Sequence, residues 1–342
     1  MHSIPTSDLN PTEERASLRG FGEVFARSAV TAYALITPAR NEERFIEATV
    51  RSVIAQTTTP RRWMIVSDGS TDRTDAIVKY YASRFSYIRL LRIDHREQRS
   101  FASKVAAFNA GYTALGGEEY EFIGNLDADV TFDPPYFAQL LEKFVATPTL
   151  GLAGGMIHEL IGNRLISQDI SLNSVAGAVQ LFRRRCFEEV GGYLPLPSGG
   201  IDTVAEILAR MRGWDVRTFP ELIVHTGRRA RIGSSNICAA RFRHGLNSYR
   251  FGYHPLFHML SSFYRTGQRP FLVGGLSSLA GYIWAFLHGE EVVLPTDAVS
   301  FLRTEQLERI HATLVGRRLP TRSGRSAAIE TTRRASDELT RL

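Results

Sequence analysis

The chain has 342 residues, of which 44% are apolar, 22% charged and 10% aromatic, and its formal net charge is +6. This composition indicates a globular protein with a sizeable core, and it excludes disordered, collagen-like and disulfide-framework classes. The two cysteines, Cys186 and Cys238, fit no metal-binding spacing, so we expect a reducing compartment.

The positive charge is concentrated near the end of the chain. Residues 316–342 hold seven arginines against three acidic residues, so the remainder is close to neutral. We expect this stretch to be a disordered tail and residues 1–30 to be a polar arm, with attraction of the tail to an anionic membrane as the alternative. The opening residues lack a signal-peptide pattern, which favours a cytoplasmic protein, and no motif indicates a nucleic-acid partner.

Short apolar runs alternate with segments of helical spacing between residues 31 and 126. The pattern predicts strands at Tyr33–Thr37, Trp63–Ser67, Ile88–Arg92 and Phe122–Leu126, and helices at Phe45–Ala55, about 74 to 83, and Ser103–Ala114. Such alternation predicts an α/β fold with βαβ units and a mainly parallel sheet flanked by helices. Ligands of these sheets bind beyond the carboxyl ends of the strands, where Thr37, Asp68 and Asp127 all fall.

The second half of the chain has a different character. Glycine-rich strands and turns follow residue 150, and a helix is predicted at Ile201–Arg212. Further on, Phe271–Leu287 has 17 residues without a charge, which is short for a membrane span. We expect residues 236–315 to form a helical extension with a buried or membrane-interfacial helical pair, a true span being the alternative.

Two carboxylates follow the strand that is predicted to end at Leu126. Asp127 and Asp129 stand at i and i+2 on extended chain, so both can face one cation. Mg²⁺ and Mn²⁺ prefer oxygen ligands and often keep open positions for substrate phosphates. The pair therefore predicts a divalent-cation site, with a solvated acidic turn as the alternative.

Two further polar loops end predicted strands at the same edge of the sheet, namely ITPARNEE (Ile36–Glu43) and VSDGSTDRT (Val66–Thr74). Asp68 can accept hydrogen bonds from the donors of a base or a ribose, because an ionised carboxylate only accepts. The alternatives are an ordinary turn at Asp68 and helix capping by Asn41 and Asp72, and we favour capping for Asp72.

These motifs, followed by a glycine pair, an acidic helix start and Gly213-Trp214, resemble the family 2 glycosyltransferases with the GT-A fold, over about residues 31–230. The resemblance implies a GT-A domain at 31–235 with a Rossmann-like sheet and a C-terminal helical extension. It also implies inverting, metal-dependent transfer of a sugar from a nucleotide-diphospho-sugar to a hydroxyl of a polysaccharide, glycolipid or lipid-linked acceptor. The subset it resembles belongs to bacterial polysaccharide or glycolipid assembly.

The resemblance further implies roles for individual residues. The implied nucleotide and donor site comprises Thr37, Pro38, Arg40, Glu42, Asp68 and Asp127. The implied metal site, for Mn²⁺ or Mg²⁺, comprises Asp127, Asp129 and His225. The implied catalytic base is Asp202, with Glu206 as a second carboxylate one helical turn later and Gln180 in the acceptor pocket.

Two positions depart from the family pattern. Ser67 stands where many members have a further aspartate, and Ile201 stands where the family has the glutamate of its Glu-Asp pair. Alternative interpretations are an N-cap at Asp202, an exposed helix charge at Glu206 and a structural role for His225.

Two classes of function therefore remain open. The first is a glycosyltransferase in the cytoplasm or on the inner face of the cell membrane. The second is a non-catalytic sugar-nucleotide-binding or membrane-tethered partner of a polysaccharide assembly system, which the residue at 201 supports. Nucleotidyl transfer is disfavoured, because no glycine-rich, lysine-bearing phosphate loop lies near the first strand.

Overall fold

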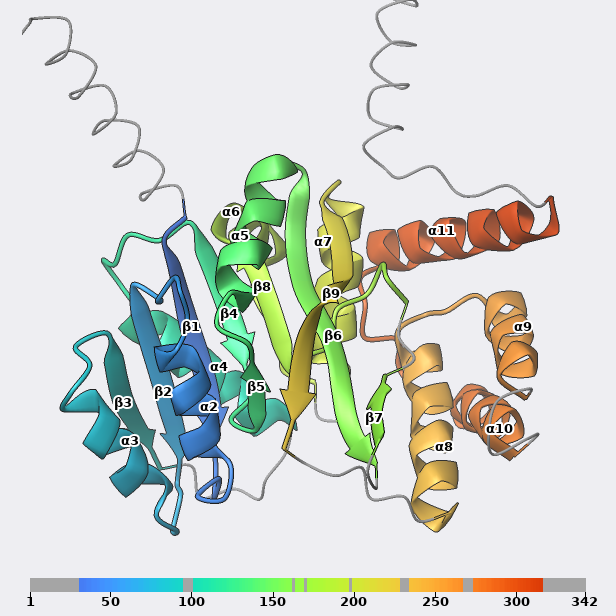
Figure 1. Ribbon diagram of the computed structural model, residues 1–342. Coiled ribbons are helices and arrows are strands. Elements are labelled where there is room, and N and C mark those ends of the chain that lie inside the picture. The colour runs from blue at the N-terminus through green and yellow to red at the C-terminus, as the bar shows by residue number, and fades with distance from the viewer. Residues whose placement is uncertain are drawn as a thin grey trace, which may run out of the picture.

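The computed structural model describes residues 31–94, 101–161, 164–168, 171–196, 199–227, 234–266 and 273–315. In this part of the chain, one sheet of nine strands separates two layers of helices (Figure 1). The predicted N-terminal arm and basic tail lie outside the described residues. The α/β architecture expected from the sequence is confirmed.

The sheet is parallel in its first half and mixed in its second half. Its strands are β1 Tyr33–Ala39, β2 Arg62–Asp68, β3 Ile88–Ile93, β4 Phe122–Leu126, β5 Val130–Phe132, β6 Leu150–Ile161, β7 Arg164–Ser167, β8 Val179–Arg183 and β9 Asp215–Thr226. Their order is β3-β2-β1-β4-β8-β6-β9-β5, with β7 paired to β6. The first four run parallel, whereas β8 runs antiparallel to both β4 and β6.

Helices cover both faces of this sheet and continue beyond it. They are α2 Ile46–Ile54, α3 Thr74–Ala82, α4 Phe101–Ala114, α5 Tyr136–Ala146, α6 Arg184–Val190, α7 Ile201–Met211, α8 Ser234–Arg250, α9 Pro255–Thr266, α10 Val273–Leu287 and α11 Thr296–Leu314. Residues of α2, α3 and α5 form one buried cluster with the sheet, and residues of α4, α6 and α7 form the other.

The strand β1 shows why the predicted strands are continuous apolar runs. Tyr33 and Leu35 belong to one buried cluster, whereas Ala34 and Ile36 belong to the other. Side chains alternate between the two faces of a strand, and both faces are covered here, so the four residues from Tyr33 to Ile36 are all apolar.

The helices α8 to α11 form the predicted helical extension. Phe251, just after α8, and Leu302 of α11 share a buried cluster with Val204 of α7. The backbones of α8 and α10 touch, because a side-chain carbon at Gly245 or Gly281 would collide with a carbonyl oxygen of the other helix. Across the described residues, no helix combines the length and apolar character needed to cross a membrane.

Candidate active site

The carboxyl ends of β1, β2 and β4 meet at one edge of the sheet. The strand register pairs Ala39 of β1 with Ser67 of β2, and Ile36 of β1 with Asn125 of β4. The polar loops that follow these strands, including the one that begins at Asp127, therefore start side by side. This edge is where ligands bind in sheets of this kind.

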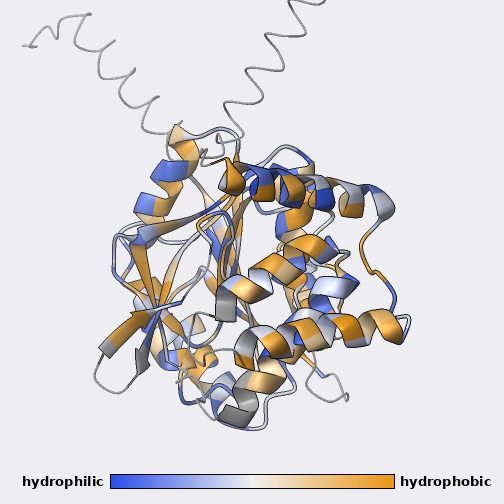
Figure 2. Cartoon of the chain, turned by 90° about the vertical axis from the view of Figure 1, so that its right-hand side faces the viewer, coloured by the Kyte–Doolittle hydropathy of each residue, from blue (hydrophilic) through white to orange (hydrophobic). Residues whose placement is uncertain are grey.

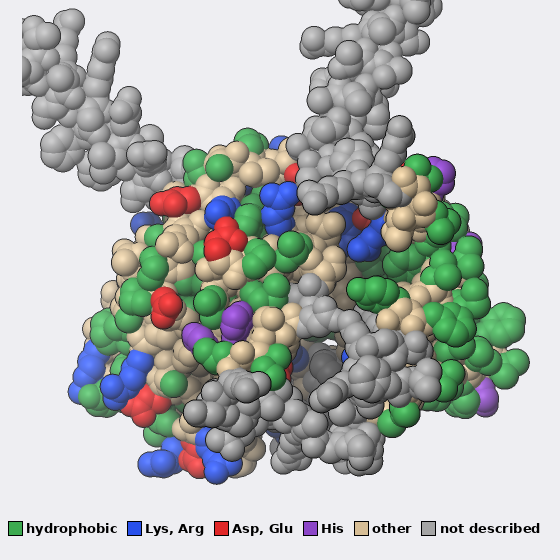
Figure 3. Space-filling view, turned by 45° about the vertical axis from the view of Figure 1, so that its right-hand side comes forward, with side chains coloured by type: hydrophobic (Ala, Val, Ile, Leu, Met, Phe, Trp, Pro, Cys, Tyr) green, Lys and Arg blue, Asp and Glu red, His purple; other side chains and the backbone are tan. Residues whose placement is uncertain are grey.

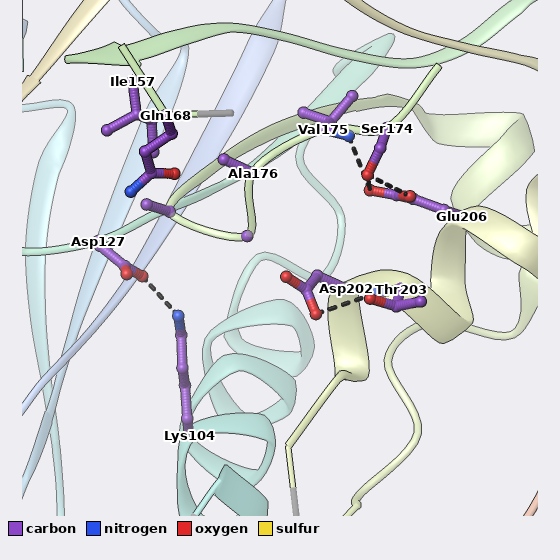
Figure 4. Close-up of a pocket in the computed structure, with 12 residues that line it drawn as sticks. Lys104, Asp127, Ile157, Gln168, Ser174, Val175, Ala176, Asp202, Thr203 and Glu206 are labelled. Carbon is purple, nitrogen blue, oxygen red and sulfur yellow. Dashed lines mark hydrogen bonds and ion pairs between the residues drawn. The ribbon is translucent and has the colours of Figure 1, made fainter. Parts of the chain in front are cut away.

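An open pocket of about 450 Å³ lies at this edge. Its lining includes Lys104 of α4, Asp127 after β4, Asp202 and Glu206 of α7, and the segment 174–178 before β8. We call residues 174–178 the pocket segment. Figure 4 shows the carboxylates of Asp127 and Asp202 directed into the same space from different elements.

Asp127 forms an ion pair with Lys104, with 2.5 Å between Oδ1 and Nζ. The two side chains are 30% and 28% exposed, so water screens the pair and its contribution to stability is only roughly 0–1 kcal/mol. Sequence reasoning missed Lys104. The signal that could have found it is that Lys104 is the one charged residue of α4, the helix that leads into β4.

Asp202 lies in the first turn of α7 and against the pocket segment. Its Oδ1 accepts a hydrogen bond from the N–H of Thr203 at 2.9 Å. A side-chain carbon added at Gly177 would lie 2.6 Å from Oδ2 of Asp202. The carboxylate therefore lies against the backbone of Gly177, where no other residue would fit without a shift. The N-cap position is held by Gly200, with φ +82°, so the N-cap interpretation of Asp202 is wrong. The start of a helix favours a negative charge.

Glu206 lies one turn further along α7 and is buried. Its Oε1 accepts from the N–H of Val175 at 2.7 Å and its Oε2 from the hydroxyl of Ser174 at 2.9 Å. Burial raises the pKa of Glu206 to about 8, against the opposing charge of Arg210. The alternative of an exposed helix charge is therefore wrong, and Glu206 anchors the pocket segment.

Gln180 also supports the pocket segment, from the side of the sheet. It is buried, its Nε2 donates to the carbonyl of Val175 at 3.1 Å, and its Oε1 accepts from the hydroxyl of Tyr193 at 2.6 Å. Burial, followed by the charges of Asp202 and Asp127, raises the pKa of Tyr193 well above its ordinary value. The tyrosine therefore stays protonated and acts as a donor.

The residues expected to contact the nucleotide lie along the ends of β1 and β2. Nη1 of Arg40 is 3.5 Å from Oδ2 of Asp68, and Arg40 and Pro38 are partly exposed. Thr37 is fully buried and its hydroxyl accepts from the indole N–H of Trp63 at 2.9 Å. The side chain of Thr37 therefore supports the nucleotide wall, by which we mean the ends of β1 and β2 and the loops that follow them, from the interior and is not part of its surface.

The two loops that follow β1 and β2 are tied together by side chains. Oδ1 of Asn41 accepts from the N–H of Thr71 at 2.8 Å, so Asn41 bridges to the second loop. Asp72 bridges back, because its Oδ2 accepts from the N–H of Glu43 at 3.0 Å. Its Oδ1 accepts from the N–H of Thr74, the first residue of α3, at 3.0 Å, but the N-cap of α3 is Arg73, so Asp72 lies one residue before the N-cap position predicted for it.

Glu42, another residue expected to contact the nucleotide, also takes part in the hydrogen bonds between these two loops. Glu42 is buried, and its N–H donates to the hydroxyl of Thr74 at 2.8 Å. Its place in the loop is therefore fixed from the interior of the protein.

Asp127 and Asp129 lie in the short connection between β4 and β5. The carbonyl of Asp129 accepts from the N–H of Gly227 at 2.7 Å, and His225 of β9 pairs with Thr131 of β5. Within the described ranges, no three His, Cys, Asp or Glu side chains are grouped closely enough to hold a metal ion. The expected third ligand, His225, is therefore not part of a preformed cluster. Two carboxylates still suit a hard cation that takes its other ligands from phosphate and water.

Sequence comparisons identify the matched part of the chain. Residues 34–193 match the model of Glycosyl transferase family 2. The chain is 32% identical over 109 residues to the uncharacterized glycosyltransferase EpsJ of Bacillus subtilis, covering 32% of this chain and 29% of EpsJ. It is 27% identical over 172 residues to the poly-beta-1,6-N-acetyl-D-glucosamine synthase of Staphylococcus aureus, covering 44% of this chain and 39% of the synthase. The chain thus spans about a third of the length of these curated relatives.

Among solved structures, the matches include the mannosyltransferase PcManGT from Pyrobaculum calidifontis in complex with GDP-Man and Mn²⁺. It matches with a TM-score of 0.46 and 20% identity, over 89% of this chain and 79% of that chain. TarS 1–349 of S. aureus in complex with UDP matches with a TM-score of 0.46 and 14% identity, over 62% and 64%. From the family match and the motifs, residues 34–193 are a glycosyl transferase family 2 domain.

Proposed function

We propose that this chain is an inverting, metal-dependent glycosyltransferase. It moves a sugar from a nucleotide-diphospho-sugar to a hydroxyl of a polysaccharide, glycolipid or lipid-linked acceptor, in the cytoplasm or on the inner face of the membrane. The observation that carries the proposal is that Asp127 and Asp202 line one pocket at the ligand-binding edge of the sheet. The family 2 domain and its curated relatives, one of them named as a polysaccharide synthase, support it.

The donor occupies the edge from the nucleotide wall to Asp127. Arg40 and Asp68 offer a donor and an acceptor group to the nucleoside. Asp127 and Asp129 would hold Mn²⁺ or Mg²⁺, whose remaining positions suit the two phosphates. When bound, the ion neutralises the charge that develops on the departing diphosphate. Lys104 adds a positive charge beside Asp127.

Asp202 acts as the general base in a single displacement. The acceptor oxygen bonds to the anomeric carbon while the bond from that carbon to the diphosphate oxygen breaks, and its electron pair leaves with the nucleoside diphosphate. The hydroxyl proton passes to the carboxylate of Asp202. The attack comes from the face opposite the leaving group, which inverts the anomeric centre. Gly177 leaves room beside the carboxylate because it has no side chain.

The proposal is tested with Asp202→Asn. We expect sugar transfer to fall by roughly 10²–10⁴-fold, the usual contribution of a general base, while donor binding persists. Binding is followed as a thermal shift with UDP-, GDP- and dTDP-sugars and Mn²⁺. The matched control is Asp297→Asn, because Asp297 also lies in the first turn of a helix and accepts from the next N–H at 2.9 Å. Normal turnover by Asp202→Asn removes this residue from the mechanism.

The non-catalytic alternative is separated in the same experiment. A binding partner without turnover gives a thermal shift with a sugar nucleotide, but neither transfers nor hydrolyses it with Mn²⁺. Absence of both turnover and binding rejects the proposed function as a whole.

A further inference from the structure

The helices α9 and α10 expose an unusual amount of apolar surface. On α9, Phe263 and Tyr264 are exposed, and on α10, Leu276, Phe286 and Leu287 are exposed. We call the outward side of these two helices the α9–α10 face. Figure 2 looks at this side and shows apolar residues along its helices, and Figure 3 shows hydrophobic side chains gathered at the right-hand edge of the molecule.

The exposed residues of α10 follow helical spacing. Val273, Leu276, Ile283 and Leu287 are three, four or seven residues apart and so lie along one side. The opposite side is buried against α8. No residue of α10 is charged, so the helix is apolar all round. Such a helix normally has apolar surroundings on every side.

The packing of α10 on α8 is of the kind that suits an apolar environment. Gly281 lies against the carbonyl of Phe242, and Gly245 lies against the carbonyl of Ser278. Small residues at a helix crossing let two backbones approach closely, which is how helices associate when no water drives them together. The helices α8 and α10 therefore pack closely through small residues, and the large apolar side chains of α10 remain on its outer side.

We propose that the α9–α10 face binds the surface of an anionic lipid bilayer without crossing it. Monomeric soluble proteins rarely leave contiguous apolar patches of this kind uncovered. The face carries Tyr264 and Trp284, and such amphipathic aromatic side chains are enriched where a membrane meets water. None of the described helices is both long and apolar enough to span a bilayer, and an interfacial position is the one we propose.

Charge selects an anionic membrane over a neutral one or a second copy of the chain. The chain continues from α11 with residues 316–342, which hold seven arginines and three acidic residues. Figure 1 shows α11 ending on the same side of the molecule as α9 and α10. A chain that has both an apolar face and a basic sequence complements anionic headgroups, and each arginine that comes near the membrane surface raises binding by about fivefold. A second copy would bring the same positive charge and be repelled.

The test is flotation of the full chain with vesicles of phosphatidylcholine and phosphatidylglycerol at 3:1, and with phosphatidylcholine alone. We expect the protein to float with the anionic vesicles and to lose binding as salt is raised. Phe263→Ser/Phe286→Ser removes rings that are 56% and 64% exposed and should reduce binding at least tenfold. The matched control is Tyr80→Ser/Val145→Ser, since these side chains are 53% and 50% exposed on α3 and α5 and lie away from the face.

Three outcomes overturn the proposal. They are failure of the unaltered chain to float with anionic vesicles, equal flotation of the Phe263→Ser/Phe286→Ser variant, and a dimer in sedimentation equilibrium that this variant abolishes while vesicles go unbound. Circular dichroism establishes that both double variants are folded. Flotation needs no turnover, so its failure leaves the proposed glycosyl transfer untouched, and the reverse also holds.

Discussion

The buried carboxyl of Glu206 should make the stability of the protein depend on pH. Its pKa is about 8 in the folded chain, against an ordinary value of 4.5, mainly because burial disfavours the charged form. The folded state therefore holds a proton that the unfolded state releases. The stabilisation is complete below pH 4.5 and is lost as the pH rises through 8.

The size of the effect follows from these two values. Between pH 6 and pH 8 the contribution of Glu206 falls by about 2 kcal/mol. For a protein of this size that corresponds to a loss of roughly 5 °C in Tm. Glu206→Gln is neutral at every pH and keeps a carbonyl that can accept from the N–H of Val175. The variant should therefore lack this part of the pH dependence.

The measurement is Tm by differential scanning calorimetry from pH 5 to pH 9 for both proteins. The control is Glu305→Gln, which removes the other carboxylate near Arg210, at 3.1 Å, and should keep the slope of the unaltered chain. Comparison within the set cancels the titration of other groups. Parallel curves for Glu206→Gln and the unaltered chain would mean that Glu206 is ionised throughout, and the argument from burial would fail.

Three other substitutions probe the pocket and the extension. Gly177→Ala brings a methyl group to 2.6 Å from Asp202, so kcat should fall at least tenfold while the donor thermal shift is kept. Lys104→Gln removes the ammonium that competes with a cation for Asp127, so Mn²⁺ should bind about tenfold more tightly in calorimetric titration without donor. Gly281→Val forces α8 and α10 apart and should lower Tm by roughly 5 °C or more.

Two further variants serve as controls. Gly274→Ala adds the same methyl group where the nearest atom is 3.7 Å away, so it should leave both kcat and Tm close to normal. Lys79→Gln removes a lysine from α3, outside the pocket lining, so Mn²⁺ affinity should not change. Unchanged Mn²⁺ affinity in Lys104→Gln would move the cation site away from Asp127. Normal kcat in Gly177→Ala would show that the space beside Asp202 is not used.

Local sequence pattern was sufficient to predict the strands and helices up to residue 126 and the later helix α7. The strands at Tyr33–Ala39 and Phe122–Leu126 are apolar runs bounded by polar turns, and the helix at Ile201–Met211 has a clear apolar face. The common edge for the loops followed from the parallel connection of βαβ units. The order of β8, β6, β9 and β5 was not predictable, because it depends on pairings between distant segments.

The support of the pocket depends on such distant pairings as well. Glu206 could be placed on the same side of its helix as Asp202, but its burial depends on the pocket segment folding over it. Lys104 reaches Asp127 only because α4 starts at the same edge as β4 ends. Residue spacing within one helix or one strand cannot predict either contact, because each contact joins residues of two different elements.

The packing of α7 against the helical extension limits how far this chain can be shortened. Phe251 presses on Gly200 at the start of α7, and near the other end Arg210 bonds to Glu305 of α11. A fragment that ends after β9 would lack both contacts and would leave Val204 and its apolar neighbours facing water. Expression of a minimal domain should therefore yield aggregates, and efforts to crystallise or engineer the protein need to retain the chain through α11.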